Sequence, residues 1–324
     1  MRRDSFAPNP ARARSAASEL DRHLLSSLDH LAQACAGQVT IDRRGVDRLA
    51  GTLAAGGTAH PLQYGIHFDL LDRIAEEDER GIADAFALLA DFASGGTIVA
   101  LDEVALGETL ADIYRRNIDS DVRRELSLIA PPAASVATAT SRLSEARALI
   151  QGVASALAEE VGHVTRQVIL AAEAPGAPYP FYGGSSFFLW GGVFLNPARH
   201  TTPYETAETL VHEAAHTLLT ALAREEPLVR NPRDARFRSP VRQDPRPMEG
   251  IYHATFVLAR TCFFHRAVAA ADLPRSIRVE ATELAERDAH HFDDGFNTVM
   301  AHADLSELGR VLIEDTSRYI REGS

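Results

Sequence analysis

Two histidines and a glutamate form the chain's most informative chemical motif, His212-Glu213-Ala-Ala-His216, an HExxH sequence. On a helix, side chains four residues apart lie on one face, so both imidazoles can bind a single metal ion. The glutamate that follows the first histidine would lie beside the open coordination position. The motif therefore predicts a metal site with Glu213 as its catalytic residue.

A third ligand is needed, and the residues after the motif do not supply it, because residues 217–222 contain neither histidine nor glycine. The next candidates are Glu249 and His253, which are four residues apart and share a helix face. Glu249 would give a His/His/Glu site like that of thermolysin-type zinc peptidases, and His253 would give three histidines. We expect His253, because it lies one turn deeper in an apolar run and a neutral ligand costs less to bury than a lone carboxylate. Glu249 stays open as the alternative.

Two arginines, Arg242 and Arg246, come shortly before this third ligand. A guanidinium near a metal can hold a carboxylate through two parallel hydrogen bonds. The same arginines can instead form surface ion pairs with Asp244. The residues alone leave both possibilities open.

The helices that must position these ligands have recognisable starts. Thr202 and Glu205 have capping-box spacing and Pro203 fits the first helical position, so a helix should begin there and carry the HExxH motif. Pro247 favours a second helix start, and the apolar run at residues 251–259 predicts that this helix is buried. The metal site is thus expected between two helices.

The remainder of the chain predicts a mainly α, α+β protein. Residues 1–15 are interpreted as a flexible tail and residues 16–130 as a helical N-terminal region. Residues 135–324 are interpreted as the metal-binding HExxH region. Within the chain we expect helices over about 63–93 and 107–128, a break at 130–135, and strands at 164–171 and 187–195 that form a small central β-sheet.

Composition narrows the function classes. The 324 residues carry 33 basic and 45 acidic side chains, a net charge of −12, which argues against nucleic acid as a partner. No lysine occurs, so lysine Schiff-base chemistry and a P-loop lysine are excluded. The two cysteines are too few for a disulfide framework. With no signal-peptide pattern and no membrane-length apolar run, we expect a cytoplasmic protein that does not bind membranes.

The C-terminal half resembles the HExxH-motif family of ribosomal peptide modification pathways, described as 2-oxoglutarate-dependent peptide β-hydroxylases. The matching residues are the segment from Ser185 to Asn196, the HExxH motif with Leu210 and Val211 before it, and a pattern of Arg242-x-Asp244-x-Arg246-Pro247-x-x-Gly250-x-x-His253-Ala254. The last pattern is the discriminating one, because many unrelated peptidases share HExxH. The resemblance covers roughly residues 150–320.

The resemblance implies a dioxygenase in which His212, His216 and His253 bind Fe(II). It also implies that 2-oxoglutarate is the cosubstrate with O2, its distal carboxylate held by Arg246 or, second, by Arg242. The substrate would be a precursor peptide, hydroxylated at the β-carbon of a side chain. The alternative, from the motif itself, is a zinc metallopeptidase with Glu213 as the general base.

Overall fold

The computed structural model describes residues 6–92, 96–118 and 126–322, and it divides the chain into two compact units. The first, here called the histidine unit, consists of Met1–Arg14, Ser141–Val164 and Thr202–Ser324. The second, the sheet unit, consists of Ser15–Thr140 and Thr165–Thr201. Each unit combines segments that lie far apart in the sequence, and the predicted division at residue 130 stays a prediction.

The described residues fold as a mainly helical α+β protein with a small mixed sheet, as the sequence predicts. The sheet has the strand order β1-β3-β6-β5, in which β1, β3 and β6 are parallel and β5 is antiparallel to β6. A separate two-stranded antiparallel ladder pairs β2 with β4. The strands are β1 (Ile98–Ala100), β2 (Leu128–Ile129), β3 (Gln167–Leu170), β4 (Ala172–Glu173), β5 (Gly183–Ser185) and β6 (Gly192–Leu195).

The strand predicted at 187–195 begins only at Gly192, because its first residues form a 3-10 helix, η1 (Phe187–Leu189), capped by the Ser186 hydroxyl. Gly191 separates the two with a φ of 86°, in the left-handed region that favours glycine. A Cβ at this position would also lie 2.9 Å from the Arg166 side chain. Hydrophobic composition alone did not reveal this turn.

Among the described residues, the helices that precede β2 in the sequence belong to the sheet unit, apart from the first residues of the first helix. The helix predicted over 63–93 is broken in two, because Glu77 adopts a φ of 57° and the Asp78 carboxylate caps the next helix at the N–H of Gly81. The helix predicted over 107–128 ends at Ile118 in the described part, and Leu128 lies in a strand. The helices are α1 (Pro10–Cys35), α2 (Arg44–Ala54), α3 (Pro61–Ala75), α4 (Glu79–Asp91), α5 (Glu103–Leu106) and α6 (Glu108–Ile118).

The sheet unit contains a buried histidine that makes its stability depend on pH. His67 on α3 is 8% exposed, its Nε2 lies 2.8 Å from the Ser27 hydroxyl, and burial lowers its pKa to about 4. Below pH 6.5 this histidine binds a proton in the unfolded chain, whereas in the folded protein it stays neutral until the pH approaches 4. Its contribution to the free energy of unfolding is therefore fully present above pH 6.5 and falls as the pH drops toward 4. We expect a loss of up to about 3 kcal/mol from this residue.

Urea unfolding of the wild type and of His67→Gln at pH 7 and pH 5 measures this loss. The variant should lose less stability between the two pH values than the wild type does. His23→Gln, at an exposed position on α1, should keep the wild-type dependence. Equal pH dependence in the wild type and His67→Gln would refute the assignment.

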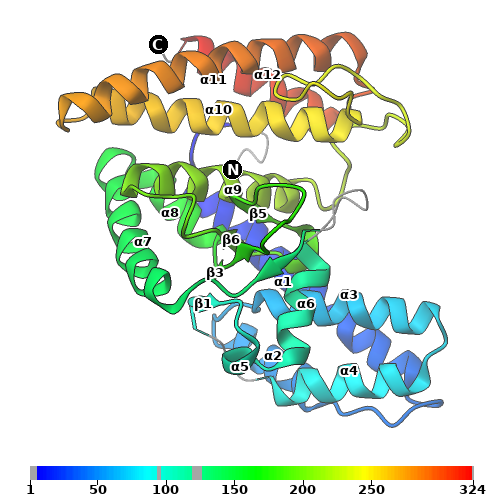
Figure 1. Ribbon diagram of the computed structural model, residues 1–324. Helices are drawn as coiled ribbons and strands as arrows, with labels where there is room; N and C mark the ends of the chain where they lie inside the picture. Colours follow the sequence, from blue (N-terminus) through cyan, green and yellow to red (C-terminus); the bar gives the residue numbers. More distant parts are fainter. Residues whose placement is uncertain (1–5, 93–95, 119–125, 323–324) are drawn as a thin grey trace. The chain divides into compact units, whose positions relative to one another are not determined.

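The histidine unit consists largely of long helices packed on α10, which contacts α9, α11 and α12 (Figure 1). The predicted start of the HExxH helix is confirmed. Thr202 and Glu205 form both hydrogen bonds of a capping box, and Pro203 is the first helical residue. The helices are α7 (Ala133–Val153), whose first residues belong to the sheet unit, α8 (Ser155–Val164), α9 (Pro203–Leu222), α10 (Met248–Ala270), α11 (Arg275–His302) and α12 (Glu307–Glu322).

The described part of the predicted N-terminal tail is packed. Phe6 is wholly buried, with its ring 5.7 Å from Phe256 and 5.2 Å from Tyr319, and its N–H donates to the Asp315 carboxylate. Helix α1 already begins at Pro10. A composition rich in arginine, proline and alanine suggested a loose segment, whereas one aromatic side chain and its backbone hydrogen bond anchor it in the histidine unit.

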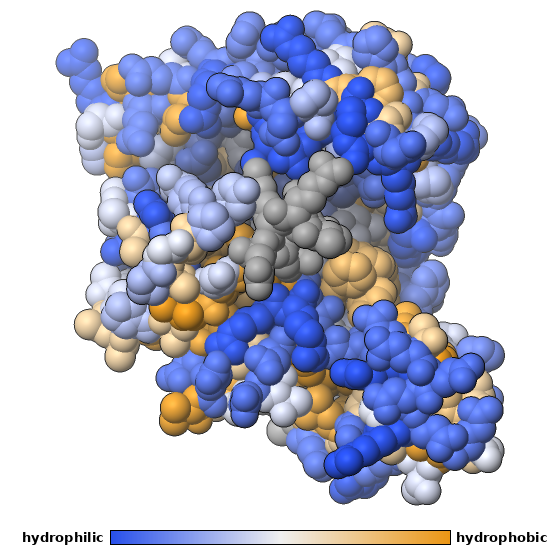
Figure 2. Space-filling model, turned by 45° about the vertical axis from the view of Figure 1, so that its right-hand side comes forward, coloured by the Kyte–Doolittle hydropathy of each residue, from blue (hydrophilic) through white to orange (hydrophobic). Residues whose placement is uncertain are grey.

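No helix in the described part of the chain is both long and apolar enough to cross a membrane. Figure 2 shows one face of the molecule, on which hydrophilic residues predominate and hydrophobic ones form small, separate patches.

Candidate metal centre

Helix α9 carries the HExxH motif on a largely buried surface. His212 and His216 are one turn apart, with ring centroids separated by 5.2 Å. The His212 side chain is 46% exposed, and His216 is half-buried. Their neighbours Val211, Ala214 and Ala215 are buried in the core, which anchors the helix and leaves the two imidazoles on the accessible side of the motif.

Helix α10 brings a third imidazole to this pair. The His253 ring lies 5.8 Å from that of His216, centroid to centroid, and is half-buried. Glu249, the alternative ligand, is exposed one turn earlier on α10. The structure thus places the side chain of His253 beside the motif, and burial lowers the pKa of His253 although the charge of Glu249 opposes this.

Electrostatics keep two of these rings neutral. Burial lowers the pKa of His216 well below its usual value, and the charges of His212 and His253 lower it further. Burial also lowers the pKa of His253 and outweighs the opposing effect of Glu249. At neutral pH both rings therefore present lone pairs, which is the form that binds a metal.

The orientations of the histidine rings are less favourable for metal binding than the types of the residues are. The planes of His216 and His253 are stacked at 21°. Within the described residues, no group of three or more histidine, cysteine, aspartate or glutamate side chains is arranged to hold a metal ion. The donor set suits a metal, but rotation of the imidazoles about their side-chain bonds is required before three nitrogens converge.

Glu213 lies next to the histidine cluster. Its side chain is 9% exposed, and its Oε1 lies 4.0 Å from Nε2 of His212. A carboxylate in this position can accept a proton from a molecule bound beside His212, or it can balance positive charge held by the histidines. The geometry is compatible with either role.

The two predicted carboxylate-binding arginines differ in their surroundings. Arg246 is half-buried just before α10, and its backbone forms two hydrogen bonds of 2.9 Å with Phe237. Its guanidinium lies 2.9 Å from the Asp244 carboxylate, so the ion pair that the sequence left open is present. Arg242 is exposed, and its backbone N–H donates to the Ser239 hydroxyl. Arg246 is the more firmly positioned of the two.

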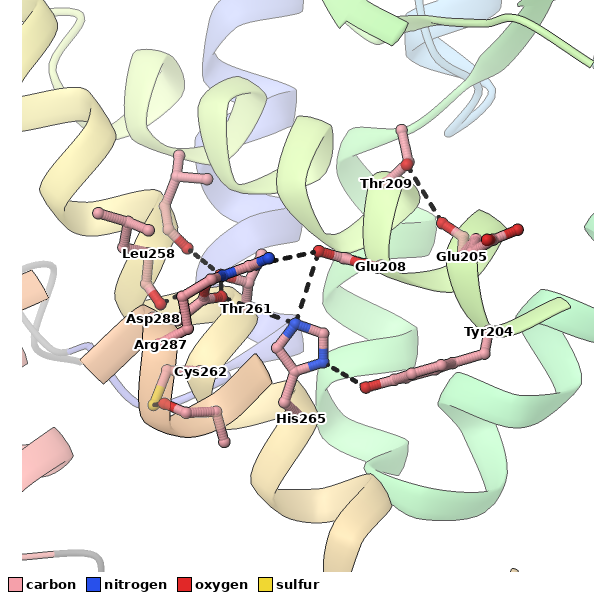
Figure 3. Close-up of polar contacts among 12 residues, drawn as sticks. Tyr204, Glu205, Glu208, Thr209, Leu258, Thr261, Cys262, His265, Arg287 and Asp288 are labelled. Carbon is pink, nitrogen blue, oxygen red and sulfur yellow. Dashed lines mark hydrogen bonds and ion pairs between the residues drawn. The ribbon is translucent and has the colours of Figure 1, made fainter. Parts of the chain in front are cut away.

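A buried polar cluster on the same helix pair was not predicted. Tyr204 and Glu208 on α9 lie close to His265 on α10 and to Arg287 and Asp288 on α11 (Figure 3). The spacing of Tyr204, Glu208 and His212 by four residues was a signal that could have revealed it.

Comparison of the chain with protein-family models finds no match, and comparison with curated proteins finds none either.

Proposed function

We propose that this protein is an Fe(II)- and 2-oxoglutarate-dependent dioxygenase that hydroxylates the β-carbon of a side chain in a ribosomally made precursor peptide. The observation that carries the proposal is the grouping of three imidazoles from two helices. The ring centroid of His216 lies 5.2 Å from that of His212 and 5.8 Å from that of His253. The cosubstrate and the substrate class rest on the resemblance of the Arg-x-Asp-x-Arg-Pro pattern before His253.

In this proposal the three histidines hold the metal through ring nitrogens, and burial, which lowers the pKa of His216 and of His253, keeps those two rings in the neutral form that binds a metal. Iron bound with 2-oxoglutarate and O2 supplies the oxidising chemistry, with CO2 and succinate as by-products. Arg246 holds the distal carboxylate of 2-oxoglutarate in place of its present partner Asp244, which is 61% exposed and therefore released at little cost. Glu213 balances the charge of a metal that has no carboxylate ligand.

A zinc metallopeptidase is the second candidate, and one contact favours it. The Glu213 carboxylate lies 4.0 Å from His212 Nε2, beside the position where a metal-bound water would need a general base. In that case the product is a peptide with a new terminus. A hydroxylase yields a product heavier by one oxygen atom, so mass spectrometry of the product separates the two candidates.

Anaerobic addition of Fe(II) and 2-oxoglutarate tests the first proposal, because their chelate has a visible charge-transfer band. We expect the band with the wild type and a dissociation constant for 2-oxoglutarate at least about 10-fold higher in Arg246→Ala, which removes a charge-assisted ion pair. Arg238→Ala, at an exposed position in the same loop, is the control and should bind 2-oxoglutarate like the wild type. Absence of the band, with zinc that iron does not displace, would refute the dioxygenase proposal.

A further inference from the structure

Helices α9 and α10 run antiparallel and make side-chain contacts toward both ends of α9. At one end, His216 of α9 stacks on His253 of α10. At the other end, the Tyr204 hydroxyl of α9 lies 2.6 Å from Nδ1 of His265 of α10. Between these ends α9 places Glu208, four residues from both Tyr204 and His212. Glu208 therefore lies on α9 between the polar cluster and the histidines of the proposed metal site.

Hydrogen-bonding requirements determine which ring nitrogen of His265 carries the proton. His265 is wholly buried, and its Nε2, which has no hydrogen-bond partner among the described residues, lies 3.6 Å from both the Glu208 and the Asp288 carboxylates. A lone pair facing two carboxylates would be repelled, so Nε2 carries the ring proton. Burial and nearby carboxylates raise the pKa of Tyr204, so its hydroxyl stays protonated and donates to Nδ1.

The two carboxylates around His265 are held to different extents. Asp288 accepts hydrogen bonds from the Thr261 hydroxyl and from two nitrogens of Arg287, so its lone pairs are well occupied (Figure 3). Among the described residues, the contacts of Glu208 with His265 and Arg287 are longer, 3.6 Å and 3.8 Å, and both engage Oε1. Its Oε2 takes part in neither contact, which leaves Glu208 with acceptor capacity.

Two observations relate Glu208 to His212. The residues are one helical turn apart on α9. Burial by itself would raise the pKa of Glu208, but His265, Arg287 and His212 together outweigh it, and the pKa is lowered. Glu208 is thus an anion one helical turn before His212 on α9. Because His212 Nε2 lies on the side of Glu213, the nitrogen that remains for Glu208 is Nδ1.

We propose that Glu208 is a positioning residue for His212, whose Nδ1–H it accepts while Nε2 binds the metal. His265 and Arg287 hold the carboxylate in place, and Tyr204 fixes the proton of His265. Metal-binding histidines generally donate their second ring N–H to a carboxylate or carbonyl, which fixes the tautomer and orients the ring. The inference rests on the proposed metal binding by the three histidines, but it does not depend on which metal binds.

Co(II) is a suitable probe, because it replaces both iron and zinc and gives measurable absorption and paramagnetic NMR signals. We expect Glu208→Ala to bind Co(II) about 10- to 100-fold more weakly than the wild type in competition with a chelator. Glu208→Gln, which keeps a neutral acceptor of the same size, should lie between the two. Glu286→Ala, which removes an exposed carboxylate beside Arg287 on α11, should bind like the wild type.

NMR separates positioning from a general loss of folding. In the Co(II) wild type, the shifted N–H proton of His212 should exchange slowly with water, and in Glu208→Ala it should exchange fast while the signals of the other two histidines persist. Unchanged affinity and unchanged exchange in Glu208→Ala, with a wild type that binds Co(II), would overturn the role of Glu208 alone. A wild type that fails to bind Co(II) would overturn the proposed function, and the role of Glu208 with it.

Discussion

Replacement of His253 by alanine should lower metal affinity by more than about 100-fold, beyond what the loss of an outer-shell partner causes. His253 is the only contribution of α10 to the proposed ligand set, and its ring lies 5.8 Å from that of His216. Without it, His212 and His216 form a two-ligand site on one helix, and the missing coordination position is filled by water. Equilibrium competition with a chelator measures the loss, and turnover should disappear with it.

Glu249→Gln is the matched control for this variant. Glu249 lies four residues before His253 on the same helix but is exposed, and it acts on His253 through its charge. We expect its removal to change metal affinity by less than about 10-fold, the lower end of the effect of an outer-shell partner. The opposite result, with tight binding in His253→Ala and weak binding in Glu249→Gln, would identify Glu249 as the third ligand and favour the His/His/Glu peptidase site.

The largest effect on stability is expected from Glu160→Ala. The carboxylate of Glu160 lies 3.0 Å from both Arg12 and Arg260, and all three side chains are at most 4% exposed. Glu160 also accepts the backbone N–H of Asn9. Its removal leaves two buried guanidinium groups without their shared counter-ion, so we expect the free energy of unfolding to fall by about 3–5 kcal/mol. Urea unfolding followed by circular dichroism measures the change.

Glu159→Ala provides the comparison, because Glu159 is the exposed neighbour of Glu160 on α8. It should change stability by no more than about 0.5 kcal/mol. A triple replacement of Arg12, Glu160 and Arg260 by apolar residues should be far less damaging than Glu160→Ala, because it removes the charges together. If Glu160→Ala unfolds at the wild-type urea concentration, the buried ion-pair group does not stabilise the protein.

Local sequence determined the features that depend on neighbouring residues. The capping box of Thr202 and Glu205 places the start of α9, and the helical repeat then brings His212 and His216 to one face. Two apolar runs likewise predict the strands β3 and β6, although Gly191 shortens the second, whereas their parallel pairing is known only from the structure. Hydrogen bonds across three or four residues and side-chain periodicity are sufficient for these predictions.

Tertiary structure decided what depends on residues that are distant in sequence. Only the antiparallel packing of α9 on α10 shows His253 beside His216, Glu249 in solvent, and Tyr204 against His265. The same holds for Phe6, whose burial depends on Phe256 and Tyr319. Such contacts arise from how helix surfaces interlock, and that depends on the shape of the whole buried interface, which no local pattern encodes.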